Sequence, residues 1–431
     1  MRVAVIGAGI VGVTTAFELA ADGHAVDVLE RRASVAEEAS FGHGGLVAPG
    51  WQGVGLLPGA PLAAWRQWLG LGLGAAALLR RGRPGAVPAR WRRRWIGAGQ
   101  PAAQLGRLQT LLPLARYSQH RLLTLEQELR LEHEGRRGCL VLLRQPQELQ
   151  AVQPLLHLLQ AEGLDAVTLD ADQARQAEPG LNPKTPLHAA IWLRGAQSGN
   201  GRQFAQGLRL QARQRGAAFR FHRQVLSLQT EGSGWRVRHA AVAPQGLVDP
   251  EDGLYDAVVV CAAQGAGELL APLGWQPPLM GLHGWSLTVP LRILEGHPDL
   301  GPRGAAFDER DRITLTRLGQ RVRVAGGAVL GARPAAEPPP PLLRRLYGVL
   351  HDWYPGATHT AQAQLWQGSR TQTPDGLPLV GATPAPGLWL NLGHGCSGWA
   401  LAAGAARVLA DQIGGQPSAV DLPTLEAARL R

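Results

Sequence analysis

The stretch that decides the fold is Arg2–Glu30, which reads RVAVIGAGIVGVTTAFELAADGHAVDVLE. Arg2–Ile6 is a short apolar run typical of a buried strand, and Gly7–Gly12 follows it as G-x-G-x-x-G. Val13–Ala21 has a helical composition, and after a glycine turn the apolar run Ala25–Leu29 leads into an acidic residue. The order strand, glycine turn, helix, strand and acid is that of a dinucleotide-binding βαβ unit.

Each glycine of this motif has a physical role. Gly7 permits the tight turn after the strand, Gly9 lets the backbone approach a pyrophosphate, and Gly12 lets the helix pack close to the strand. The free N–H groups at the helix N-terminus then face the phosphates. Glu30 stands where a carboxylate accepts the ribose hydroxyls, and its charge disfavours the extra phosphate of NADP. These residues leave FAD and NAD both open.

Composition limits the class of protein. The 431 residues are enough for two or three domains, and a hydrophobic content of 45% predicts a packed core. The formal net charge of +10 is typical of proteins that meet nucleic acid or anionic membranes. However, Lys184 is the only lysine, so the basicity reflects an arginine-rich composition, and no nucleic-acid-reading motif accompanies it. We therefore expect no nucleic-acid partner.

The cysteines indicate a reducing compartment. Cys139, Cys261 and Cys396 are odd in number, widely spaced and without metal-ligand spacing, so we expect neither a disulfide framework nor a metal site. The chain opens directly on an apolar strand, without the pattern of a secretory signal. No apolar run reaches the roughly 18 residues of a membrane span. The expected location is cytoplasmic.

One segment indicates contact with a membrane surface. Trp65–Leu79 is apolar and contains tryptophan, and Arg80–Trp95 after it mixes arginine with tryptophan. Basic and aromatic residues beside an apolar run are typical of an interfacial segment. A helical hairpin packed on the protein, with its arginines in solvent, explains the same residues. Peripheral contact with the inner face of the cell membrane is therefore one of two interpretations.

Glycine-rich turns recur after later strands. Ser40–Leu46 is a small-residue loop that lets a backbone lie against a flavin ring or its ribityl chain. Tyr255–Cys261 is a buried-strand pattern that runs into another glycine turn. The strand pattern Leu388–Leu392 precedes Gly393–Gly398, and a helix pattern follows at Ala400–Ile413. The C-terminal part thus repeats the strand-to-glycine order of the N-terminal site.

In these segments the sequence resembles the D-amino-acid oxidase-like FAD-dependent oxidoreductases, most of all the branch of the bacterial D-amino-acid dehydrogenase small subunits. The motifs that carry the resemblance lie in order along almost the whole chain: V-I-G-A-G-I-V-G-V-T-T-A at Val5–Ala16, V-L-E-R ending at Arg31, Ser40–Pro49, Gly284–Thr288, T-P-D-G at Thr373–Gly376, and N-L-G-H-G at Asn391–Gly395. The resemblance implies FAD, held without a covalent bond, and so decides between the two dinucleotides.

The resemblance also implies the fold and the FAD contacts. It predicts an α/β protein in which a Rossmann-like FAD-binding domain of the glutathione-reductase type 2 is interleaved with an α+β substrate domain built on an antiparallel sheet. The FAD-binding domain is predicted at residues 1–50, 196–276 and 361–431, and the substrate domain at 51–195 and 277–360. The predicted FAD contacts are Gly7, Ala8, Gly9, Ile10, Val11, Gly12, Glu30, Arg31, Ser40, Gly44, Gly45, Leu46, Val225, Ala262, Gly265, Gly393, His394, Gly395, Cys396, Ser397 and Gly398.

Other segments have the patterns expected of a second sheet. Gly138–Arg144 and His188–Leu193 are strand patterns, and Met280–Pro290 and Arg321–Ala325 alternate like antiparallel strands. Arg202–Gly216 is a helix pattern. These segments are compatible with the implied substrate domain and its connections.

Candidate substrate residues follow from the resemblance. Arginine holds a carboxylate with two hydrogen bonds, and Arg370 matches the family's arginine before the T-P-D-G turn. His283, Trp285 and Arg317 lie in predicted substrate-domain strands and are further pocket candidates, although ordinary packing explains each of them as well. The sequence departs from the family pattern at residues 43, 46, 371, 396 and 397, where it has His, Leu, Thr, Cys and Ser. The glycine-rich FAD-binding motifs are thus retained, whereas the identity of the substrate stays undecided.

These features predict oxidative deamination of a D-amino acid to a 2-oxo acid and ammonia, with electrons passed to a quinone or another carrier. A flavin accepts a hydride from the α-carbon of a neutral amine, so no catalytic base is required. A sarcosine, glycine or cyclic-imino-acid oxidase of the same superfamily, which passes electrons to oxygen, is the alternative enzyme. An FAD-binding subunit without turnover is the alternative of another class.

Overall fold

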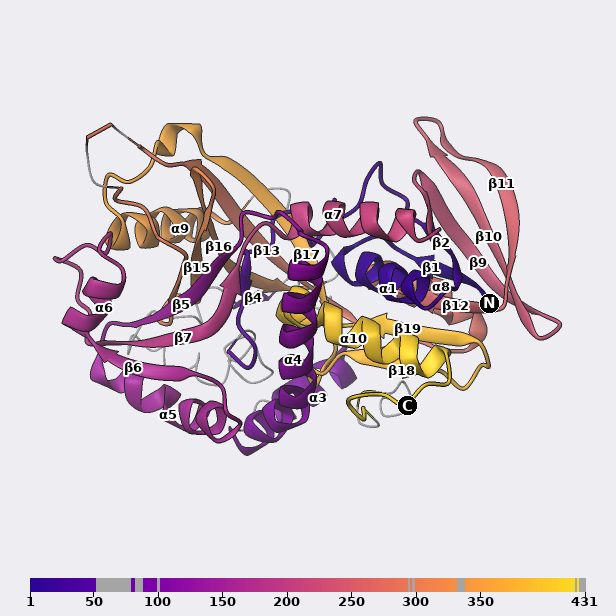
Figure 1. The fold of residues 1–431 in the computed structure, drawn as a ribbon, viewed down its shortest axis with the longest axis horizontal. Coiled ribbons are helices and arrows are strands. Elements are labelled where there is room, and N and C mark those ends of the chain that lie inside the picture. The colour runs from indigo at the N-terminus through magenta and orange to yellow at the C-terminus, as the bar shows by residue number, and fades with distance from the viewer. Residues whose placement is uncertain are drawn as a thin grey trace.

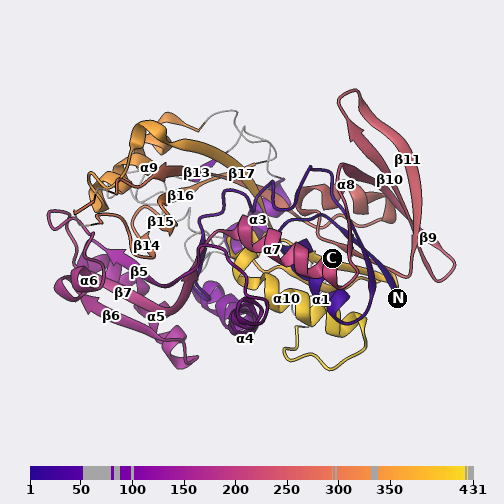
Figure 2. The same ribbon diagram turned by 45° about the horizontal axis from the view of Figure 1, so that its top comes forward.

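The computed structural model of the chain describes residues 1–51, 79–81, 88–98, 101–293, 295–296, 299–331, 338–422 and 425. Two units lie side by side, and each is built around its own sheet (Figure 1 and Figure 2). The long helix α4 (Pro101–Glu128) runs between them, and the N-terminus lies on the unit that contains β1.

The first unit is built on a six-stranded sheet. Its strand order is β18 (Leu379–Ala382), β19 (Leu388–Leu392), β12 (Ala257–Val260), β1 (Arg2–Ile6), β2 (Ala25–Leu29) and β8 (Ala218–Arg220). All neighbours pair in parallel except β18 and β19, which are antiparallel. The sheet therefore brings the carboxyl ends of strands from three distant parts of the chain to one edge, where α/β proteins bind ligands.

Both faces of this sheet are covered by apolar packing. Val3 and Val5 of β1 face a core shared with the helices, whereas Ala4 and Ile6 face a second core on the other side. The helices of the first face are α1 (Ile10–Ala21), α4, α7 (Gly201–Gln214) and α10 (Gly398–Ile413). The second face is covered by α8 (Ala266–Leu270) and by the three-stranded antiparallel sheet β9 (Arg223–Glu231), β10 (Gly234–Ala243) and β11 (Gly246–Tyr255), which projects at the end of the molecule (Figure 1).

The second unit is built on a ten-stranded sheet. Its main order is β17 (Gln364–Gln372), β13 (Met280–Pro290), β16 (Arg321–Leu330), β15 (Ile313–Leu318), β14 (Ala305–Asp308), β5 (Arg136–Leu143), β7 (Ala189–Ser198) and β3 (Leu46–Val47), with β4 (Leu79–Arg81) on β16 and β6 (Ala166–Asp170) on β7. Its pairs are antiparallel except β5 with β14 and β4 with β16. The helices α5 (Pro146–Ala161), α6 (Ala171–Ala177) and α9 (Pro340–Trp353) complete this unit (Figure 1).

Several predicted elements have the predicted bounds. β1, β2, β13 and β19 match them at both ends, and α10 begins two residues before the predicted helix. β3 and β17 belong to the ten-stranded sheet, although the predicted limits place both with the FAD-binding segments. These strands carry the chain between the two units, and the limits of the five segments stay a prediction.

The arginine- and tryptophan-rich segment is partly described. α3 (Ala89–Gly97) buries Trp91 and Trp95 against the ten-stranded sheet, and its arginines Arg90, Arg92 and Arg93 are exposed. The apolar run Trp65–Leu79 lies outside the described residues except for its last residue. Among the helices that can be described, none combines the length and the apolar character needed to cross a membrane.

Candidate active site

The glycine turn after β1 has the close contacts that its motif predicts. Gly7 has φ +100°, and a Cβ there would lie 2.8 Å from the carbonyl oxygen of Cys261. A Cβ on Gly12 would overlap the carbonyl oxygen of Gly7. By contrast, the nearest atom to a Cβ on Gly9 would be Ser40 Oγ, at 3.7 Å. Gly7 and Gly12 therefore permit backbone packing, whereas Gly9 leaves room for a ligand.

The N-terminus of α1 has unused hydrogen-bonding capacity. Gly9 is its N-cap and has no side chain to supply a cap, and its first turn contains no acidic residue. The Ile10 N–H donates to Ser40 Oγ at 3.2 Å. A helix end of this kind attracts phosphate through its remaining N–H groups and its dipole.

Glu30 is fixed by the backbone at the end of β2. Its two carboxylate oxygens accept hydrogen bonds from Ala8 N (2.7 Å) and Arg32 N (2.8 Å). Burial raises the pKa of Glu30, and these two N–H groups act against that rise. Arg31 does not pair with it, because its guanidinium binds Glu38 at 2.7 Å. Each Glu30 oxygen retains a lone pair that can accept from a ribose hydroxyl.

A cavity of about 310 Å³ lies at the carboxyl edge of the six-stranded sheet. The predicted FAD contacts that line it are Gly7, Gly9, Ile10, Val11, Glu30, Arg31, Ser40, Val225, Ala262, Gly265, Gly393, His394, Gly395 and Gly398. The predicted contacts that do not line it are Ala8, Gly12, Gly44, Gly45, Leu46, Cys396 and Ser397. Ala8 instead binds Glu30, and Gly12 packs on the glycine turn.

Two unpaired polar atoms in the wall of this cavity fit a dinucleotide ligand. Asn391 Oδ1 and His394 Nε2 are buried and have no hydrogen-bond partner among the described residues. Burial lowers the pKa of His394 to about 4, so its imidazole is neutral at pH 7. Buried polar groups without partners are rare, and a bound ligand is an ordinary explanation for them.

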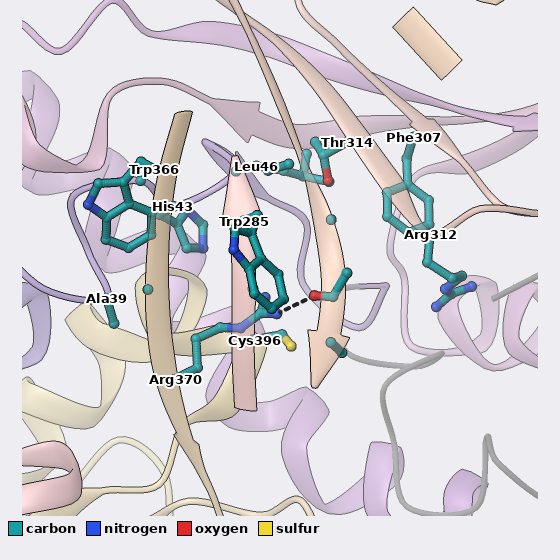
Figure 3. A pocket seen from close by; sticks show the side chains of 18 of the residues that line it. Ala39, His43, Leu46, Trp285, Phe307, Arg312, Thr314, Trp366, Arg370 and Cys396 are labelled. Carbon is teal, nitrogen blue, oxygen red and sulfur yellow. Dashed lines mark hydrogen bonds between the residues drawn. The ribbon is translucent and has the colours of Figure 1, made fainter. Parts of the chain in front are cut away.

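A second cavity, of about 110 Å³, adjoins the first. Gly44, Leu46 and Cys396, which were predicted as FAD contacts, line this cavity. Its aromatic lining residues are Trp51, Trp285, Phe307 and Trp366, and its cations are Arg312 and Arg370 (Figure 3). Arg370 and Ala39 line both cavities. The arginine therefore lies where a substrate in the second cavity would meet a cofactor in the first.

The hydrogen bonding of Arg370 leaves most of its guanidinium for a ligand. Its Nη2 donates to the carbonyl oxygen of Gly327 at 3.3 Å, as the dashed line in Figure 3 shows. A Cβ on Gly284 would lie 2.9 Å from the same Nη2, so the guanidinium needs a glycine at that position. The geometry is compatible with the carboxylate-binding role predicted for Arg370.

Two of the other pocket candidates lie outside both cavities. His283 is fully buried, and its Nε2 lies 3.0 Å from the carbonyl oxygen of Gly331. The pairing of β13 with β16 has a bulge between His283 and Trp285, and the additional residue lies on β16. Arg317 forms an ion pair with Asp299. Of these three candidates only Trp285 lines the second cavity.

The loop between β2 and β3 is held by side chains of the ten-stranded sheet that the sequence did not single out. Arg323 donates from Nη1 to the carbonyl oxygens of Phe41 (3.1 Å) and His43 (3.3 Å). Thr316 donates to the carbonyl oxygen of Gly44 at 2.6 Å. Burial lowers the pKa of Arg323 to about 10, which leaves it charged at pH 7. The one sequence signal that could have indicated a role for Arg323 was its position between two valines of a buried strand.

His43 connects this loop to the C-terminal glycine segment. Its Nδ1 accepts a hydrogen bond from the Gly45 N–H at 3.1 Å, and its ring meets the Trp399 ring edge-on at 5.9 Å. Burial lowers the pKa of His43 to about 4, and the charges of Arg370 and Arg323 add to that effect. The imidazole is therefore neutral at pH 7, and because Nδ1 accepts, its proton is on Nε2.

A dinucleotide-type cavity that meets an arginine-bearing cavity is the arrangement expected of an oxidoreductase whose cofactor and substrate sites adjoin. Comparison with known proteins gives the same class. A family model described as FAD dependent oxidoreductase matches residues 2–412. The chain belongs to this family, and FAD is its cofactor.

Named relatives and solved structures are similar over the whole chain. A D-amino acid dehydrogenase of Cereibacter sphaeroides is 37% identical over 434 residues, which cover all of this chain and 94% of that protein. A D-amino acid dehydrogenase of Vibrio cholerae is 35% identical over 96% of this chain and 95% of that protein. The glycine oxidase structure from Geobacillus kaustophilus has a TM-score of 0.73 at 20% identity and covers 99% of this chain and 98% of its own. The predicted α/β fold with a Rossmann-like domain is confirmed.

Proposed function

We propose that this chain oxidises D-amino acids to 2-oxo acids and ammonia, with a quinone or another carrier as the electron acceptor. The observation that carries the proposal is the position of Arg370, which lines both the cofactor cavity and the aromatic cavity beside it. The relatives named D-amino acid dehydrogenase support the D configuration of the substrate. The family alone supports the coarser statement, which is an oxidoreductase that uses FAD.

The residues of the first cavity fit the parts of FAD. The N–H groups at the start of α1 would bind the phosphates, and Glu30 would accept the ribose hydroxyls. Ala39 and Arg370 line both cavities and so mark the part of the first cavity that adjoins the second, where the flavin ring would lie. When bound there, FAD supplies an acceptor for the hydride that leaves the substrate α-carbon.

The residues of the second cavity bind and orient the substrate. Arg370 binds its carboxylate, and the aromatic walls exclude water from the α-carbon. The described lining residues include two arginines but no Asp or Glu. A substrate ammonium group would therefore lie near two cations and have no anionic partner among these residues. The cavity therefore favours the neutral amine, which is the form that loses a hydride.

Anaerobic reduction of the FAD-loaded protein tests the proposal. D-Amino acids should bleach the flavin absorbance, whereas their L-enantiomers should leave it unchanged. Bleaching by sarcosine or a cyclic amine, with none by D-amino acids, would overturn the proposal in favour of an amine oxidase. If no amine bleaches the flavin, the chain binds FAD without turnover, and the proposal is wrong.

We also infer peripheral contact with an anionic membrane through α3. Its exposed arginines Arg90, Arg92 and Arg93 face away from the buried Trp91 and Trp95. Juxtaposed basic side chains are attracted to anionic lipid. The protein should float with phosphatidylglycerol vesicles at low salt, and replacing the three arginines with Gln should abolish flotation. A wild-type protein that stays in the pellet fraction contradicts the inference.

A further inference from the structure

We propose that the second cavity selects D-amino acids whose side chain ends in a carbonyl or carboxyl oxygen, and that Arg312 is the residue that selects them. The proposal rests on the function proposed above and names the substrate class of the same site. It starts from hydrogen-bond donors of the lining residues that have no acceptor among the residues that the structure describes.

Arg312 lies at the end of the cavity away from Arg370. Figure 3 shows Trp285 beside the guanidinium of Arg370, and Arg312 apart from both, beside Phe307. The Arg312 side chain is 10% exposed, and its Nη1 forms an ion pair with Glu309. The cavity lining thus has two arginines, and of these Arg370 also lines the cofactor cavity.

Three N–H groups of the lining residues are buried without a hydrogen bond within the described part of the chain. They are Trp51 Nε1, Trp285 Nε1 and Arg312 Nε. An unpaired buried donor costs about 1–3 kcal/mol, and a ligand oxygen that accepts from it removes that cost. Because all three groups can only donate, they favour a side chain with an acceptor at its end.

The surroundings of Arg312 hold its guanidinium in place. Its Cζ lies 5.1 Å from the centre of the Phe307 ring, in a cation–π contact. Its backbone has φ +55°, in the left-handed region that non-glycine residues rarely adopt and that recurs at functional sites. The side chain is therefore positioned by its neighbours before a ligand arrives.

Charge supports an oxygen acceptor rather than an apolar group. Glu309 is the carboxylate paired with Arg312 and occupies Nη1, which leaves Nε for another acceptor. A side-chain amide would keep this end of the cavity neutral, whereas a carboxylate would add a charge beside a buried Glu309 whose pKa is raised by burial.

Substrate series test the role of Arg312. In the FAD-loaded protein, kcat/KM for D-glutamine and D-glutamate should exceed that for D-norleucine, which has similar length but no acceptor. Arg312→Met should lower kcat/KM for D-glutamine and D-glutamate by about 10- to 100-fold. It should change kcat/KM for D-norleucine by less than about threefold. Arg310→Met is the matched control, because Arg310 pairs with Glu148 and does not line the cavity. The ratio of kcat/KM for D-glutamine to that for D-glutamate shows whether the cavity prefers a side-chain amide or a side-chain carboxylate.

A binding measurement separates this proposal from the proposed function. Glutarate has one carboxylate for each arginine, whereas valerate has only one carboxylate, and neither can be oxidised because both lack an amine. The flavin difference spectrum should give a Kd about tenfold lower for glutarate in the wild type, and Arg312→Met should remove the difference. The double variant Arg312→Met, Glu309→Gln avoids an unpaired buried carboxylate and should behave like the single variant.

Each result has one meaning. Equal binding of glutarate and valerate by the wild type, or an unchanged substrate preference in Arg312→Met, overturns the assignment of Arg312 even if D-amino acids are oxidised. Glutarate selectivity that depends on Arg312, in a protein that oxidises no D-amino acid, supports the binding role and overturns the proposed function.

Discussion

Arg370 should affect substrate binding far more than it affects FAD. It lines both cavities, and its free guanidinium N–H groups are the predicted partners of the substrate carboxylate. Arg370→Leu should raise KM by about 100-fold, because a bidentate, charge-assisted contact is lost. Steady-state kinetics and the ratio of flavin to protein absorbance measure both effects. Arg317→Leu, which removes an arginine outside both cavities, should leave KM unchanged; an unchanged KM in Arg370→Leu would remove that residue from the site.

His394 should make the FAD-free protein less stable in acid. Its side chain is 8% exposed, and burial lowers its pKa to about 4, below the ordinary value of 6.5. Between pH 6.5 and pH 4, His394 is therefore protonated in the unfolded chain but neutral in the folded chain. The free energy of unfolding consequently falls as the pH drops from 6.5 to 4. For one histidine the loss is about 3 kcal/mol.

Urea unfolding of the FAD-free protein at pH 7 and pH 4.5 measures this loss. The variant His394→Asn lacks the titrating group and should lose less stability over the same range. If the two proteins show the same pH dependence, His394 is not the source of the acid sensitivity.

Among the elements, α1, α4 and α10 are joined by a buried carboxylate. Glu18 of α1 is fully buried and pairs with Arg121 of α4 (2.8 Å) and Arg407 of α10 (3.0 Å). Glu18→Gln leaves Arg121 without an anionic partner, whereas Arg407 keeps Asp22 and Asp411, and it should lower the free energy of unfolding by about 3 kcal/mol. The exposed pair Arg116–Glu162 is the control, since Glu162→Gln should change stability by less than about 0.5 kcal/mol. Equal effects in chemical denaturation would contradict the buried-pair argument.

Elements with strong local patterns were predictable from the sequence, and contacts between distant elements were not. The bounds of β1 and β19 follow from apolar runs that stop before a glycine, those of β13 from a run that ends at Pro290, and those of β2 from a run that stops before Glu30. Hydrophobic alternation predicted the strand that carries His283 and Trp285, but it could not show that Trp285 lines the second cavity and His283 does not. Alternation along β15 also explains why Arg317 lies outside both cavities. Thr316 faces the loop and binds the Gly44 carbonyl oxygen, so the next residue, Arg317, faces the other side of the sheet and pairs with Asp299.

For the whole molecule, the candidate site depends on contacts across most of the chain. The cofactor motif is local, and residues 2–30 contained enough information to predict it. The substrate cavity instead combines loop residues near position 43 with strands near 285, 314 and 366, and Arg323 reaches Phe41 across 282 positions. No local pattern specifies which of these side chains share a cavity, and only the pairing of the ten-stranded sheet brings them together.

The same organisation predicts that FAD stabilises the whole fold. The first cavity is lined by residues from Ile6 to Gly398, so bound FAD contacts strands that unfolding must separate. At a concentration 100 times its Kd, FAD should raise the free energy of unfolding by about 2.7 kcal/mol. Gly12→Val should abolish this increase, because its Cβ would overlap the Gly7 carbonyl oxygen, whereas Gly348→Ala, with open space around its Cβ, should retain it. Thermal unfolding with and without added FAD measures the effect, and a Gly12→Val protein that FAD still stabilises fully would contradict the predicted role of the glycine turn.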